Sequence, residues 1–150
     1  MIRLLSVAVL CALATPAFAQ SPLPLSKILT TVEAGGTRVV VSADRGRRGW
    51  DVTSCPAGGR LCREDRIDAV TGAVLESERE GVSSLPPADA KPASAVAAQL
   101  EALAIGAITE LEFDDRVWEA KLRDGRRRAE FKLDPRTGAT QRCKGSLCPR

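Results

Sequence analysis

The side chains that most often carry enzyme chemistry are scarce in this sequence of 150 residues. It contains no histidine, so the commonest general base, metal ligand and member of a catalytic triad is missing. The motifs of phosphate-binding loops, dinucleotide sites, zinc peptidases and serine hydrolases are absent as well. Two adjacent carboxylate pairs remain, Glu64–Asp65 and Asp114–Asp115, on a charged strand and in a predicted turn. We therefore predict that the protein is not an enzyme and that it holds no cofactor.

Four cysteines in two close pairs follow the N-terminal segment: Cys55, Cys62, Cys143 and Cys148. An even number of cysteines in an exported chain predicts two disulfides. Three connectivities are open, and the local pairing within each pair needs no long-range assumption. The gaps of six and four residues differ from the usual spacing of structural zinc ligands and from the C-x-x-C spacing of redox sites. We expect disulfides and no metal.

The first nineteen residues have the three-part organisation of a secretory signal peptide. A basic start with Arg3 precedes an apolar run over residues 4–14, and residues 17–19 form a small-x-small cleavage site. The apolar run is too short to span a bilayer, which needs about 20 residues. Cys11 follows a leucine, whereas a bacterial lipobox has a small residue there. We predict cleavage after Ala19 and a periplasmic or secreted chain without a membrane span.

The charge of the chain is close to balanced. The formal net charge is +3, and it falls to +2 when the signal segment with its single arginine is removed. Two basic clusters, at residues 45–48 and 126–128, lie at predicted turns, where solvated hairpin ends are expected. This balance gives no case for a nucleic-acid-binding protein, and we expect no nucleic acid among the partners.

Two short patterns occur twice, in the same order. The pattern D-x-x-T-G-A stands at residues 68–73 and 134–139, and W-[DE]-[VA] begins at Trp50 and Trp118. Aspartate can bond the backbone two residues on and glycine accepts positive φ, so D-x-x-T-G-A predicts the tip of a β-hairpin. The two tryptophans fall at equivalent inward positions, which favours core anchors over ligand-stacking residues. Recurrence at separations of 66 and 68 residues indicates a tandem duplication.

Each copy is predicted to be a helix followed by four short strands. Apolar residues at helical spacing mark the two helices: Leu25, Ile28, Leu29 and Val32 in the first, and Val96, Leu100 and Leu103 in the second. Residues 81–92, rich in serine, proline and alanine, form a linker. The predicted fold class is α+β, with two tandem repeats over residues 20–80 and 93–150. Each repeat packs one helix on its own antiparallel sheet of three to four strands.

One strand of the first copy has no apolar face. Arg63, Glu64, Asp65 and Arg66 are charged, whereas the second copy has alternating apolar residues at this place. Such a strand lies at a sheet edge, where charges deter aggregation, or faces a partner, and we favour the edge. Because binding residues often lie on loops and edges held by a scaffold, these four residues and the loop between Cys55 and Cys62 are the predicted contact for a partner.

The order of helix, strand, W-[DE]-[VA] strand and D-x-x-T-G-A hairpin, found twice, resembles the PepSY domain. The resemblance implies an export-pathway domain with a helix packed on an antiparallel sheet, and no catalytic residues. PepSY domains also occur in the propeptides of thermolysin-like metallopeptidases, where they are linked to inhibition and folding assistance.

We expect an exported binding module, a peptidase inhibitor or regulator, whose partner is a peptidase or an envelope protein. The alternative is a periplasmic sensory or structural accessory protein that binds a small ligand or an envelope partner. The tandem layout is also similar to the β-lactamase inhibitory proteins at the level of the fold.

Overall fold

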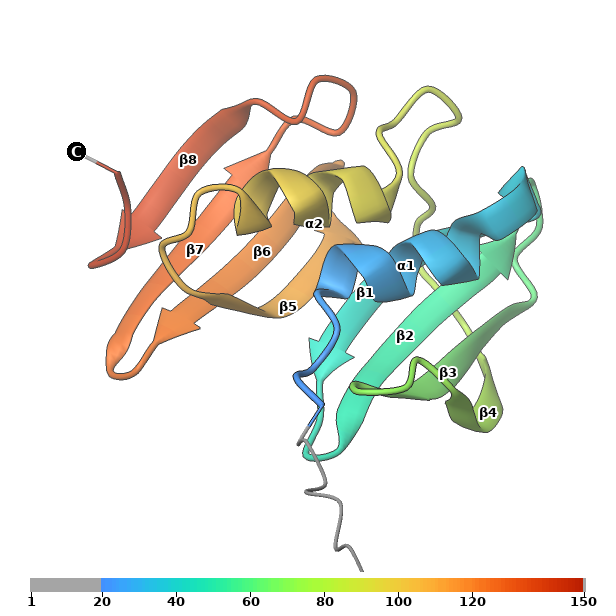
Figure 1. Cartoon of the computed structure of the whole chain (residues 1–150). Helices are drawn as coiled ribbons and strands as arrows, with labels where there is room; N and C mark the ends of the chain where they lie inside the picture. Colours follow the sequence, from blue (N-terminus) through green and yellow to red (C-terminus); the bar gives the residue numbers. More distant parts are fainter. Residues whose placement is uncertain (1–19, 150) are drawn as a thin grey trace, which may run out of the picture.

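The computed structural model describes residues 20–149, so the predicted signal peptide lies outside the described residues. Two helices, one 3₁₀ turn and eight strands follow one another along the chain (Figure 1). They are α1 (Leu25–Glu33), η1 (Ala34–Gly36), β1 (Arg38–Arg45), β2 (Gly49–Pro56), β3 (Cys62–Asp68), β4 (Val74–Glu80), α2 (Ala93–Glu101), β5 (Ala107–Asp114), β6 (Val117–Asp124), β7 (Arg127–Leu133) and β8 (Thr140–Gly145). None of the helices between residues 20 and 149 has the length and apolar character needed to cross a membrane.

The eight strands form one continuous antiparallel sheet in the order β4-β3-β2-β1-β5-β6-β7-β8. The predicted fold class, with each helix on its own sheet of three to four strands, is therefore wrong. The two four-strand halves join where β1 pairs with β5, through Ser42 opposite Glu112, Ala43 opposite Leu111 and Asp44 opposite Glu110. Alternation of apolar and polar residues is the same in an edge strand and in a central strand, so the sequence pattern does not reveal this junction.

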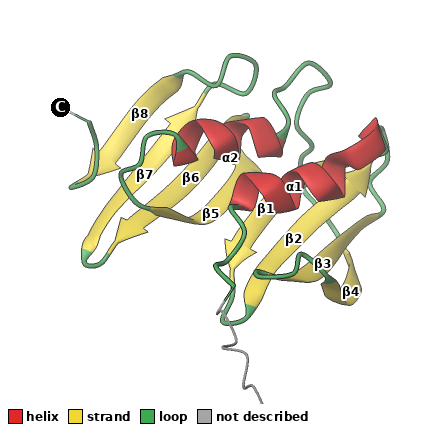
Figure 2. Ribbon diagram, viewed as in Figure 1, coloured by secondary structure: helices red, strands yellow, loops and turns green. Residues whose placement is uncertain are grey.

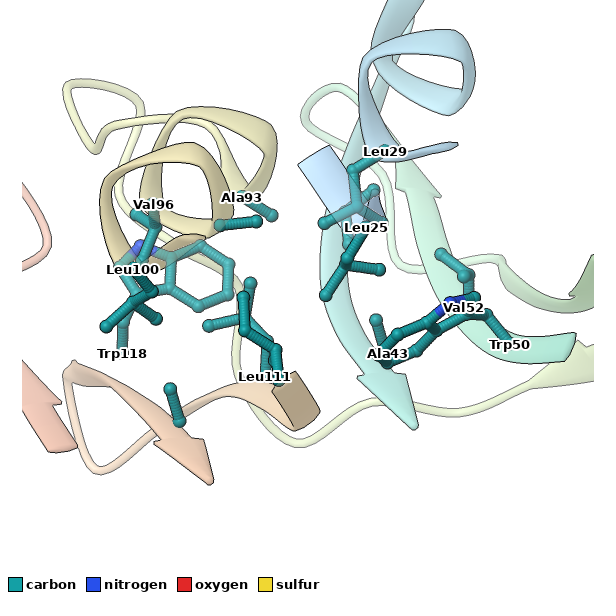
Figure 3. Close-up of a cluster of buried hydrophobic side chains, with 14 of the residues drawn as sticks. Leu25, Leu29, Ala43, Trp50, Val52, Ala93, Val96, Leu100, Leu111 and Trp118 are labelled. Carbon is teal, nitrogen blue, oxygen red and sulfur yellow. The ribbon is translucent and has the colours of Figure 1, made fainter. Parts of the chain in front are cut away.

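Both helices lie side by side on the same face of the sheet (Figure 2). The apolar side chains of the strands point toward them and form one buried cluster, which Figure 3 shows around Leu111 and Ala43. Trp118 is fully buried, Trp50 is 3% exposed, and Trp118 meets Phe113 edge to face with ring centroids 5.5 Å apart. The prediction that both tryptophans are core anchors is confirmed.

The two D-x-x-T-G-A stretches are hairpin tips with the same hydrogen bonds. Asp68 Oδ1 accepts from the backbone N–H groups of Val70 and Thr71 and from the Thr71 hydroxyl. Asp134 Oδ1 accepts the same three bonds from the residues two and three positions on. The glycine of each tip has a φ of 73°, which a side chain would make unfavourable. These bonds lower the pKa of both aspartates below the ordinary value.

The charged strand β3 does not lie at the sheet edge, so that preference is wrong. It is paired on both sides, with β2 and with β4, and β4 is the edge strand. Its inward side chain Asp65 is only 1% exposed, and two donors offset the cost of this burial: Arg63 at 2.7 Å and the hydroxyl of Ser77 on β4. A buried carboxylate with two donors replaces the apolar face that the sequence lacks.

Candidate functional site

The face of the sheet turned away from the helices, called here the open face, is lined by polar and charged side chains. Side chains alternate between the two faces along each strand, and the register between neighbouring strands shows which residues share a face. From β4 to β5 its charged residues are acidic apart from Arg66: Glu76, Glu78, Glu80, Glu64, Asp51, Asp44, Glu110, Glu112 and Asp114. From β6 to β8 basic residues prevail over Glu119 and Glu130: Lys121, Arg123, Arg128, Lys132, Arg142 and Lys144. The open face thus has an acidic part and a basic part.

The acidic part has its centre at the junction of the two halves of the sheet. Asp44 on β1 lies directly opposite Glu110 on β5, and Glu112 is two residues further along β5. Partial desolvation raises the pKa of Asp44 to about 6, with further contributions from the charges of Glu110 and Glu112. The pKa of Glu112 is raised as well, by desolvation first and then by Asp114 and Glu110. Three carboxylates therefore repel one another at the middle of the face.

Ion pairs neutralise only part of this face. The guanidinium of Arg66 bridges Asp51 at 3.0 Å and Glu76 at 2.6 Å. The ammonium of Lys121 lies 2.7 Å from Glu110, and Lys132 pairs with Glu119. Within residues 20–149, neither Asp44 nor Glu112 has a salt bridge. Two of the three central carboxylates, those of Asp44 and Glu112, therefore have no ion-pair partner in this part of the chain.

The linker crosses one end of the open face. Residues 81–92 join β4 to α2 and pass behind the sheet in Figure 1. Val82 and Leu85 pack against the buried cluster, so this crossing segment is held in place. A cavity of about 830 Å³ lies between the linker residues 83–87 and the β5–β6 turn, and Asp114 lines it. The charged lining of this cavity is mixed, because Asp114 and Asp115 lie there together with Arg116 and Arg136.

The β5–β6 turn at this rim has an unusual backbone. Asp115 and Arg116 have φ values of 46° and 66°, in the left-handed region that favours glycine. Two successive left-handed residues are typical of the tight turn that suits a two-residue hairpin. The carboxylate pair seen in the sequence is thus split between the last residue of β5 and an exposed turn.

The four residues predicted as a partner contact do not share one surface. Glu64 and Arg66 belong to the open face, next to the acidic centre. Arg63 and Asp65 point to the helix side of the sheet and bind each other there. The neighbouring loop between Cys55 and Cys62 follows β2 and carries Leu61, which is 89% exposed. Only half of the predicted contact lies on the candidate surface.

The structure contains both disulfides in the local pairing. Cys55 is joined to Cys62, and Cys143 is joined to Cys148. The first bond links neighbouring strands β2 and β3, and the second ties the C-terminal segment to β8. Within residues 20–149 no group of three or more His, Cys, Asp or Glu side chains is placed so that it could hold a metal ion.

The central carboxylates were missed by the sequence argument. Asp44 belongs to the first half of the chain, whereas Glu110 and Glu112 belong to the second half. Only the pairing of β1 with β5 brings them together. The available signal was the alternation of acidic and apolar residues from Glu110 to Asp114, which predicts one acidic face for that strand.

No family model and no curated protein matches this chain. One solved structure similar to it is the crystal structure of a "putative lipoprotein" from Clostridium difficile 630, with a TM-score of 0.49 and 14% sequence identity. The similarity covers 87% of this chain and 97% of that chain. A similarity of this size leaves the function of the chain to be inferred from its own residues.

Proposed function

We propose that the protein is an exported, non-enzymatic binding module that docks a protein partner on its open face. The observation that supports this proposal is the set of unpaired carboxylates at the centre of an extended sheet face. An acidic field of this kind attracts a partner with exposed lysine or arginine side chains and repels acidic ones. Desolvation first and neighbouring carboxylates second raise the pKa values of Asp44 and Glu112, and a partner cation placed beside them would favour their charged forms.

Export is supported by the sequence of residues 1–19 and by the two disulfides, which persist in oxidising compartments. The PepSY resemblance supports a role in inhibiting or regulating a peptidase. In this proposal, Glu64 and Arg66 contribute to docking, whereas Asp65 supports the fold.

The proposal is tested with a tagged mature chain incubated in an envelope extract and treated with a zero-length reagent that joins carboxylates to amines. We expect Asp44 and Glu112 to form cross-links to lysines of a captured protein. The variant Asp44→Asn/Glu112→Gln should weaken binding of that purified partner by about tenfold or more. The matched control Arg123→Gln/Arg142→Gln, on the basic part of the same face, should bind like the parent chain.

The opposite pattern, with binding lost in the control variant and kept in the acidic variant, would place the partner elsewhere and refute the proposal. Cross-links confined to the helix side would refute it too. If the captured protein is a peptidase, its activity with and without the bound chain separates an inhibitor from a passive binding protein.

A small-ligand role is the second candidate, and one cavity favours it. About 480 Å³ of space lies between the linker, the start of β1 and Trp118, within the range of small-molecule pockets. Arg38 lines this cavity, and its pKa is lowered by desolvation and then by the charge of Arg63. A ligand with a carboxylate and an apolar body would fit this lining. Thermal stabilisation by medium-chain fatty acids, lost in Arg38→Gln, is the corresponding test.

A further inference from the structure

Within the described chain, each edge of the sheet has a strand that could pair with one further strand. The strands β4 and β8 end the strand order, so each has a neighbour on one side only. All residues of β4 are exposed, as are those of β8 except the half-buried Cys143. Strands at a sheet edge carry backbone N–H and C=O groups that can accept another strand. Val74 and Leu75 add exposed apolar surface to the β4 edge.

The two edges run in directions that suit each other. Each neighbouring pair of strands in the sheet is antiparallel. Seven such steps separate β4 from β8, so these two strands point in opposite directions. A second copy shifted sideways, with its helices on the same side, therefore brings its β4 antiparallel to β8 of the first copy. The alternating order would continue unbroken across the contact.

Charge on the edges distinguishes the ways in which two copies can meet. On the open face, β4 carries Glu76, Glu78 and Glu80, and β8 carries Arg142 and Lys144. Contact of β4 with β4, or of β8 with β8, would set like charges against each other, which is destabilising. Contact of β4 with β8 sets carboxylates opposite cations on the same face. A register with Glu78 opposite Lys144 also puts Glu80 opposite Arg142, because both pairs are two residues apart.

We propose that a second copy of this chain binds at the sheet edge, with β4 of one copy paired to β8 of the next. This contact is heterologous, so it leaves one free β4 and one free β8 and can extend into short linear chains. It keeps the helices of all copies on one side and leaves the open face uncovered. The inference is independent of the proposed docking function.

Sedimentation velocity of the mature chain over micromolar to millimolar concentrations tests this. The average mass should rise with concentration and fall when salt is added, because the contact is electrostatic. The variants Glu78→Lys/Glu80→Lys and Arg142→Glu/Lys144→Glu should each be monomeric. Their equimolar mixture should associate again, since each supplies the edge that the other has lost. The control Arg47→Glu/Arg48→Glu, in the β1–β2 turn, changes the net charge by the same amount and with the same sign as Arg142→Glu/Lys144→Glu, and it should associate like the parent chain.

Circular dichroism establishes that each variant is folded, and recovery in the mixture excludes misfolding as the cause of lost association. Hydrogen exchange should show protection of amides in residues 74–80 and 140–145 that increases with concentration. A parent chain that stays monomeric, a mixture that does not associate, or protection elsewhere without protection of these strands would overturn the proposal.

Discussion

Glu33 and Glu101 each cap the N-terminus of the other residue's helix. Glu33 ends α1 and accepts hydrogen bonds from the backbone N–H groups of Ala93 and Ser94 at 2.9 and 3.2 Å. Glu101 ends α2 and accepts from the backbone N–H of Ser26 at 3.2 Å and from its hydroxyl at 2.5 Å. A proline precedes each helix, and neither has a side-chain cap of its own. Each carboxylate therefore satisfies free donors and faces the positive end of the partner helix dipole.

This reciprocal contact ties the two halves of the chain on the helix side, opposite the β1–β5 junction. We expect Glu33→Ala and Glu101→Ala each to lower the free energy of unfolding by about 1 kcal/mol, the usual cost of a lost cap. Glu33→Gln and Glu101→Gln should lose less, because the amide oxygen still accepts a bond. Urea unfolding of the four variants measures this. Equal losses for alanine and glutamine would show that the charge, and not the hydrogen bond, carries the effect.

At the two tryptophan positions, the free energy of unfolding should depend far more on the size of the side chain than on the presence of the indole N–H. The Nε1 atoms of Trp50 and Trp118 are buried, and within residues 20–149 neither has a hydrogen-bond partner. Trp118→Ala should therefore cost about 3 to 5 kcal/mol through the cavity it leaves. Trp118→Phe should cost much less, since it also removes an unsatisfied donor. Trp50→Ala should behave like Trp118→Ala. Denaturant midpoints check this, and a midpoint for Trp118→Ala close to that of the parent chain would contradict the core role.

The sequence predicts local structure well here because local physics decides it. The hairpin tips after Asp68 and Asp134 follow from bonds within six residues, and the helices follow from apolar spacing. The two short disulfides likewise need no distant information. Each of these features is specified by residues that are close in the chain.

What the sequence does not predict depends on contacts between distant segments. The pairing of β1 with β5 needs residues 42–44 to meet residues 110–112, and no local pattern marks that meeting. The sequence suggests that Asp65 is a charge on an edge strand, whereas in the structure Arg63 and Ser77 bind it on the buried side of the sheet. The acidic centre of the open face could not be predicted for the same reason, because its carboxylates come from both halves of the chain.

The raised pKa of Asp44 predicts a pH dependence of stability. Its value of about 6 in the folded chain lies above the ordinary value of 3.8, so the folded state binds more protons between these values. The free energy of unfolding should therefore fall as pH rises from about 4 to 6. The change should be about 1 kcal/mol or less, because solvent screens an exposed carboxylate.

The variant Asp44→Asn removes this dependence, and it should be more stable than the parent chain at pH 7 and similar at pH 4. Urea unfolding at both pH values makes the comparison, with Glu80→Gln at the sheet edge as the control. Glu110, Glu112 and Asp51 favour the protonated form of Asp44, while Lys121 opposes it. If Asp44→Asn gains no stability at pH 7, the prediction is wrong, and attraction by Lys121 offsets the effect of the neighbouring carboxylates on Asp44.

The two disulfides should each stabilise the fold by a similar amount. By the chain-entropy estimate, loops closed by residues five to seven positions apart contribute about 2 kcal/mol each. Cys55→Ser/Cys62→Ser and Cys143→Ser/Cys148→Ser should each lose about that amount. Intact mass after alkylation without reductant should show no modified cysteine in the mature parent chain. Two or more alkylated cysteines there would contradict the disulfide assignment.

The left-handed backbone at Arg116 predicts a stabilising substitution. Glycine adopts a φ of 66° without the steric cost that arginine pays, so Arg116→Gly should raise the free energy of unfolding by about 0.5 to 1 kcal/mol. Arg126 occupies the second turn position of the β6–β7 hairpin, after Gly125, and its φ is not positive. Arg126→Gly is therefore the matched control and should not stabilise. Because Arg116 lines the cavity of about 830 Å³ beside the open face, partner binding measured on the same variant reports whether its side chain is used there. A lower denaturant midpoint for Arg116→Gly than for Arg126→Gly would mean that the arginine side chain stabilises the turn by more than the backbone strain costs.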